Sequence, residues 1–86
     1  MKVSPDLRST HNHDGAVVLD IRHGEMFRLN LVGSRILELL AAGGTEAHIV
    51  EGIAAEFRIS RETVASDVHE FIAHLEKHQL LLQRGS

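Results

Sequence analysis

The sequence predicts an α+β fold, in which an N-terminal antiparallel β-hairpin or three-stranded meander precedes a bundle of three helices. Two observations lead to this prediction. In the first third of the chain, apolar and polar residues alternate, as they do along half-buried strands. After residue 30, apolar residues recur every three or four positions instead, which is the spacing of helices that bury one face.

Two strands and a tight turn form the predicted hairpin. The first strand covers residues 16–21, with Val17, Leu19 and Ile21 on one face and Val18, Asp20 and Arg22 on the other. Residues 22–24, Arg-His-Gly, supply the turn. The second strand covers residues 25–29, with Phe27 and Leu29 sharing a face. A shorter strand is expected around residues 3–9, because turn-forming residues follow it: Asn12, Asp14 and Gly15.

Three residues can cap the first turns of the predicted helices. Asn30, Thr45 and Ser60 each precede an apolar run with helical spacing, and their side-chain oxygens can accept from free helix N–H groups. Gly43-Gly44 ends the first helix, and the third reaches about His78. The apolar positions in the three helices are Ile36, Leu37, Leu39 and Leu40; Ile49, Val50, Ile53, Ala54 and Phe57; and Val64, Val68, Phe71, Ile72 and Leu75.

This order of elements indicates one domain, spanning residues 1–86 with its core at about 15–82. A small sheet facing three helices, with a short step between the last two, is a winged helix-turn-helix arrangement. Residues 80–82 are expected to end the domain as a short extended segment. The last strand of such a sheet leaves backbone N–H and C=O groups unpaired along one edge, which makes that edge the candidate binding surface.

Composition argues against several classes of function. A chain of 86 residues with 43% hydrophobic residues can build one core but hardly an enclosed catalytic cavity as well, so we expect no enzyme. There is no cysteine, which excludes thiol chemistry and suits the cytoplasm. The formal charge of -3 and the lack of an apolar run of about 18 residues argue against nucleic acid and membrane as partners.

Seven histidines raise the question of a metal site. His74 and His78 have the spacing that places two imidazoles on one face of a helix, and His11 and His13 form a second cluster. Neither cluster offers the three or four ligands of a complete site. We therefore expect solvated histidines, no metal and no other cofactor.

Four local sequences occur in an order and spacing typical of a known family. They are Asp-Gly-Ala-Val-Val-Leu-Asp at residues 14–20, Gly-Glu-Met-Phe-Arg-Leu-Asn at residues 24–30, Gly33 with Ile36 and Leu39-Leu40, and Asp67-Val68 with Phe71, Leu75 and Leu80-Leu81. Together they resemble the PqqD-like family, the RiPP recognition elements that bind leader peptides for post-translational modification enzymes. The first two are more similar to the free-standing recognition proteins of lasso peptide pathways than to the pyrroloquinoline quinone member.

The resemblance implies a precursor leader peptide that pairs as an extra strand with residues 25–29 and lies over the third helix. It also implies delivery of the precursor to a leader peptidase and a cyclase. The residues expected to contact the leader are Glu25, Met26, Phe27, Arg28, Leu29, Val64, Asp67, Val68, Phe71 and Leu75.

Plainer explanations exist for several of these residues. An apolar stripe such as that on the third helix is most often core packing. Asp67 could be solvated or paired with a surface base such as Arg28, or it could bond an incoming peptide. Glu25 and Arg28 could be edge-strand charges that discourage aggregation.

Three other functions compete with leader binding for lasso peptides. A winged-helix regulator would insert residues 61–77 into the DNA major groove, but this segment has two basic and four acidic residues, a formal charge of -2 that phosphates would repel. A PqqD-type chaperone would serve a radical enzyme in quinone cofactor biosynthesis. An exposed strand edge could also pair with a second copy of the chain.

Overall fold

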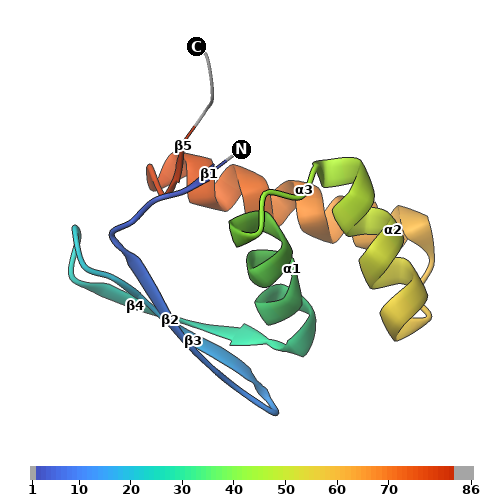
Figure 1. Cartoon of the computed structure of the whole chain (residues 1–86), viewed down its shortest axis with the longest axis horizontal. Coiled ribbons are helices and arrows are strands. Elements are labelled where there is room, and N and C mark those ends of the chain that lie inside the picture. Colours follow the sequence, from blue (N-terminus) through green and yellow to red (C-terminus); the bar gives the residue numbers. More distant parts are fainter. Residues whose placement is uncertain (1, 83–86) are drawn as a thin grey trace.

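A three-stranded antiparallel sheet and three helices make up the body of the protein, seen in a computed structural model that describes residues 2–82 (Figure 1). The sheet has the order β2-β3-β4. The elements along the chain are β1 (Lys2–Val3), β2 (Leu7–Asn12), β3 (Gly15–Asp20), β4 (Glu25–Asn30), α1 (Leu31–Ala41), α2 (Glu46–Phe57), α3 (Arg61–Lys77) and β5 (Leu81–Leu82). The predicted α+β class, with strands first and helices after, is confirmed.

The first strand of the sheet begins later than the sequence suggested. Instead of one strand near residues 3–9, the structure has β1, a turn, and then β2. In the turn, the carbonyl of Ser4 accepts from the N–H of Leu7 at 3.1 Å, and Ser4 Oγ accepts from the N–H of Asp6 at 3.2 Å. Pro5 has no N–H to donate to a ladder, so the chain turns here before it enters the sheet.

The turn between β2 and β3 depends on Asn12 and Gly15. Asn12 Oδ1 accepts a hydrogen bond from the N–H of Asp14 at 2.8 Å. Gly15 has a φ of +145°, and a Cβ atom at this position would overlap the carbonyl oxygen of Leu29 on β4. Both the conformation and the close approach of the neighbouring strand therefore require glycine.

One face of β3 is covered by the helices and the other is open. Ala16, Val18 and Asp20 are buried, whereas Leu19 and Ile21 are 42% and 50% exposed. Apolar residues occur on both faces of this strand, so the sequence pattern alone did not decide which face the helices cover. The open face also carries Met26, which lies opposite Leu19 in the register.

All three predicted helix caps are present. Asn30 accepts from the N–H of Gly33 at 2.8 Å, Thr45 from that of His48 at 3.2 Å, and Ser60 from that of Thr63 at 3.3 Å. Asn30 is also the last residue of β4, so α1 begins directly where the strand ends. The core that the helices build with the sheet consists of Ala16, Val18, Ile36, Leu37, Leu40, Ile49, Ile53, Val64, Val68, Ile72, Leu75, Leu80 and Leu81.

The two ends of the described chain are held together away from the main sheet. Lys2 pairs with Leu82 and Val3 with Leu81 in a separate two-stranded sheet. The carbonyl of Leu80 accepts from the N–H of Ser4 at 2.8 Å. We call β1, β5 and these contacts the terminal clasp. Among the helices of residues 2–82, none combines the length and hydrophobicity needed to cross a bilayer.

Candidate binding groove

The outer side of β4 is an open sheet edge within the described residues, because β4 pairs only with β3. The hydrogen bonds of β3 show which of its backbone groups face β4. The N–H of Ile21, just after β3, donates to the carbonyl of Asp6 at 3.0 Å and so points toward the β2 side. Successive residues of a strand direct their backbone groups to opposite sides, so Val18 and Asp20 bond β4.

The same alternation fixes the direction of the backbone groups of β4. Phe27 lies opposite Val18 and exchanges hydrogen bonds with β3. Its neighbours Met26 and Arg28 therefore direct their N–H and C=O groups away from β3, toward the open edge. These groups can form a ladder with an added strand without any change in the sheet.

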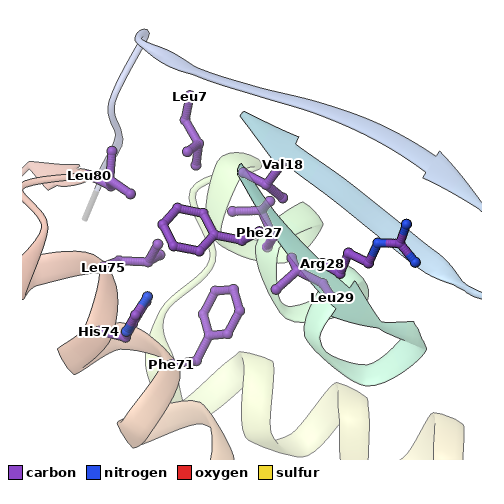
Figure 2. Close-up of a pocket in the computed structure, with 10 residues that line it drawn as sticks. Leu7, Val18, Phe27, Arg28, Leu29, Phe71, His74, Leu75 and Leu80 are labelled. Carbon is purple, nitrogen blue, oxygen red and sulfur yellow. The ribbon is translucent and has the colours of Figure 1, made fainter. Parts of the chain in front are cut away.

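An apolar cavity of about 290 Å³ lies between the inner face of the sheet and α3 (Figure 2). Its lining residues come from β2, β3, β4, α1, α3 and the segment before β5. They are Leu7, Val18, Phe27, Arg28, Leu29, Leu37, Phe71, His74, Leu75 and Leu80. Figure 2 shows the Arg28 side chain extending away from the other lining side chains. Its guanidinium therefore does not form part of the cavity wall.

Aromatic contacts connect β4 with α3 at one end of this cavity. The ring of Phe27 contacts the ring of His74 edge-on, with centroids 5.6 Å apart, and that of His78 at 6.0 Å. The two imidazole centroids are 4.5 Å apart, one helical turn from each other. We use the term groove for the open edge of β4, the cavity and the α3 side chains beside it.

The structure brings together about half of the residues expected to contact a peptide. Phe27, Arg28, Leu29, Phe71 and Leu75 line the cavity. Glu25 and Met26 are exposed on β4. The backbone groups of Met26 face the open edge, whereas those of Glu25, opposite Asp20, face β3.

The other three predicted contacts lie elsewhere. Val64 and Val68 are fully buried, at 0% exposure, and belong to the core. The face of α3 that carries them packs inward, so they have no surface to offer a peptide in this structure. Asp67 is exposed and is not part of the cavity lining. No ion pair joins it to Arg28 in residues 2–82.

Five lining residues were not anticipated: Leu7, Val18, Leu37, His74 and Leu80. Four of them come from elements that the sequence placed in the core or at the chain ends. His74 had a usable signal, because it follows Phe71 by three residues and must share its side of the helix. Its interpretation as a solvated surface histidine hid this position.

The hairpin turn that leads into β4 contains a buried carboxylate. Asp20 is fully buried, and its Oδ2 lies 2.6 Å from His23 Nδ1, while its Oδ1 accepts from the N–H of His23 at 3.2 Å. Burial raises the pKa of Asp20, but the hydrogen bonds and the charge of His23, with the backbone N–H of Arg22, lower it further than burial raises it. The pKa of this carboxyl therefore lies below its ordinary value, and the ionised form holds the turn.

Within the described range, no group of three or more His, Cys, Asp or Glu side chains is placed to hold a metal ion. The groove instead combines unpaired strand backbone with an apolar cavity. Such a surface suits an extended peptide that adds a strand and inserts an apolar side chain.

Two solved structures share this fold over nearly the whole chain. The structure described as "TbiB1 in Complex with the TbiA(beta) Leader Peptide" is 38% identical, with a TM-score of 0.84, over 100% of this chain and 98% of that one. The structure described as "Lasso peptide synthetase B1 complexed with the leader peptide" is 23% identical and shares the fold, with a TM-score of 0.81 over 95% and 96% of the two chains. No curated protein matches the sequence.

The sequence also matches the family described as "Coenzyme PQQ synthesis protein D (PqqD)" over residues 15–81. This range begins with the glycine at the β2–β3 turn and ends in β5, so it contains the open edge of β4 and nearly all of the cavity. Since the match covers well over half of the chain, the protein belongs to the PqqD family.

Proposed function

We propose that this protein binds the leader segment of a ribosomally synthesised precursor peptide in lasso peptide biosynthesis. The observation that carries the proposal is the open backbone of Met26 and Arg28 directly beside an apolar cavity. The 38% identity with TbiB1, whose structure was solved with a leader peptide, supports the same assignment across the whole chain.

Binding proceeds by strand addition to β4. The backbone groups of Met26 and Arg28 pair with the leader and supply affinity that depends little on its sequence. Leader side chains opposite Phe27 and Leu29 point toward α3, because side chains opposite each other in a sheet share a face. One of them fills the cavity as an apolar anchor, in contact with Phe71 and Leu75, and this contact supplies specificity.

The protein performs no chemistry in this proposal. It holds the leader while a leader peptidase and a cyclase act on the rest of the precursor, and their action is accelerated because the precursor is present at raised effective concentration. These enzymes and the precursor meet in the cytoplasm.

The direct test is titration with a fluorescein-labelled leader, read by fluorescence polarisation. The TbiA(beta) leader is the first probe, and the leader of any short precursor found encoded beside this protein is the second. Saturable binding of either leader is expected, with no binding of labelled duplex DNA.

The opposite result has a clear meaning as well. If duplex DNA binds in a salt-dependent manner and neither leader binds, the winged-helix regulator is the better assignment. If both leaders fail but a precursor of quinone cofactor biosynthesis binds, the protein instead serves a radical enzyme.

A further inference from the structure

Two imidazoles give the otherwise apolar groove a polar end. His74 lines the cavity, and His78 lies one helical turn further along α3, with the ring of Phe27 against both. No hydrogen bond or ion pair to either imidazole occurs within residues 2–82. Their four ring nitrogens are therefore available to a ligand.

The register of strand addition determines which part of a bound peptide meets these rings. Met26 and Arg28 supply the ladder, so Phe27 and the peptide residue opposite it form a pair without direct hydrogen bonds. Side chains are closest in such pairs, with Cα atoms about 4.5 Å apart. Phe27 contacts His74 and His78, so the side chain opposite Phe27, which shares its face of the sheet, is directed toward the same two rings.

The residues around the two rings carry a small formal excess of acid. β4 contributes Glu25 and Arg28, and α3 contributes Glu70, Glu76 and Lys77 within about one turn, so three acids stand against two bases. All five side chains are exposed and screened by solvent. The imidazoles, which contact Phe27 directly, supply the polar atoms at this end of the groove.

We propose that His74 and His78 form a subsite for a carboxylate side chain of the bound peptide, at the residue opposite Phe27. This inference rests on the proposed strand addition. An acidic side chain there accepts a hydrogen bond from a ring N–H of each imidazole. The apolar anchor then occupies the neighbouring position two residues along the strand, opposite Leu29 and near Phe71.

A random peptide library provides a probe that requires no known ligand. A displayed library of 12-residue peptides is selected against the wild-type protein and against the double variant His74→Phe/His78→Phe, which keeps two aromatic rings but removes their nitrogens. Wild-type selection is expected to enrich Asp or Glu two residues from a bulky apolar residue. Selection with the double variant is expected to keep the apolar residue and lose the acid.

One enriched peptide is then synthesised with its acid and with the neutral isostere, Glu replaced by Gln or Asp by Asn. For the wild-type protein, the neutral peptide is expected to bind about tenfold more weakly, as for loss of a hydrogen bond to a charged group. This difference should disappear in the double variant. His69→Phe is the matched control, because His69 is on the same helix with a side chain that is 78% exposed and near Glu46 of α2.

The possible failures can be separated. If apolar anchors are enriched without an acid at a fixed spacing, the carboxylate subsite is wrong and leader binding by strand addition stands. If no peptide is enriched by a wild-type protein whose fold is confirmed by circular dichroism, both the subsite and the proposed function are overturned.

Discussion

Phe71 is the single side chain on α3 whose replacement tests the groove most directly. It is half-buried and lines the cavity, so its ring contributes apolar surface without being sealed in the core. In Phe71→Asp, the leader loses an apolar contact and meets a carboxylate, and its affinity is expected to fall at least tenfold, since burial of a Phe side chain is worth about 1.5–3 kcal/mol.

The control adds the same charge elsewhere on the helix. Ala73 is exposed on α3 and does not line the cavity, so Ala73→Asp is expected to leave leader affinity within about twofold of wild type. Fluorescence polarisation measures both variants after circular dichroism has shown that they fold. Equal affinities for Phe71→Asp and wild type would place the leader outside this cavity.

Gly15 makes the hairpin geometry depend on one residue. Gly15→Ala places a Cβ against the carbonyl of Leu29 at a φ that L-residues rarely adopt, and is expected to cost more than about 1 kcal/mol of unfolding free energy. Gly52→Ala on α2 meets no atom within 4 Å and should instead stabilise by about 0.5–1 kcal/mol. In urea denaturation, the changes in unfolding free energy of the two variants should have opposite signs. An unchanged unfolding free energy for Gly15→Ala would contradict the close approach of β3 and β4.

At the scale of secondary-structure elements, the turn between β3 and β4 has a predictable pH dependence. The pKa of Asp20 in the folded state lies below its ordinary value of 3.8. The carboxylate therefore stabilises the fold fully above about pH 4, and this stabilisation is lost as the pH falls through the folded-state pKa. The carboxylate accepts its shortest hydrogen bond from His23 Nδ1, at 2.6 Å, and this bond weakens when Asp20 is protonated.

Asp20→Asn removes this titration while keeping the size of the side chain. Wild type is expected to be more stable than the variant at pH 7, and the difference should narrow below about pH 4, where the wild-type carboxyl becomes protonated. Urea denaturation between pH 7 and pH 2 measures it. A constant difference over this range would mean that the charge of Asp20 does not stabilise the turn.

The open edge of β4 predicts a difference between adjacent proline substitutions. Met26→Pro removes an N–H that faces solvent, so the sheet should survive while leader binding is lost. Phe27→Pro removes an N–H that bonds β3 and should unfold the hairpin. Met26→Ala, which keeps the N–H, is the control and should bind the leader.

Hydrogen exchange checks the same register without mutation. The amides of Met26 and Arg28 are expected to exchange quickly in the free protein and slowly with bound leader, whereas that of Phe27 is protected in both states. Protection of Met26 in the free protein at high concentration would indicate instead that β4 pairs with a second copy of the chain.

At the scale of the whole molecule, the terminal clasp is expected to affect both the unfolding free energy and the affinity of the groove for the leader. Leu80 and Leu81 are nearly fully buried, and Leu80 also lines the cavity. Deleting residues 1–4 removes β1 and exposes these side chains, so unfolding free energy is expected to fall by about 1–3 kcal/mol. Leader affinity should fall as well, because Leu80, which lines the cavity, is no longer held in place by β1.

Lys2→Ala is the matched control for this deletion, because it removes an exposed side chain and keeps the backbone pairing of β1 with β5. Thermal denaturation measures the change in stability of both variants, and leader titration measures the change in their affinity. If the deletion lowers stability but leaves leader affinity unchanged, the clasp supports the fold without shaping the groove.

Local signals were sufficient to predict the β3–β4 hairpin and the three helices, but not the division of the first strand into β1 and β2. The caps at Asn30, Thr45 and Ser60 accept from N–H groups within three residues, and Gly24 and Gly43 have the positive φ angles of their turns, so neighbouring residues determine these features. The four family motifs likewise predicted the edge strand, β4, and the α3 residues Phe71 and Leu75 that line the cavity.

Only the tertiary structure decided which of several apolar surfaces is covered. On β3 either face could have been buried, and the helices cover the one with Ala16 and Val18. On α3 a stripe wide enough for both core and groove is divided, with Val64 and Val68 sealed in the core and Phe71 and His74 at the cavity. The cavity also takes Leu7 and Leu80 from opposite ends of the chain. Hydrophobic burial is non-directional, so a sequence specifies that such residues are covered, whereas the packing of distant elements specifies by what.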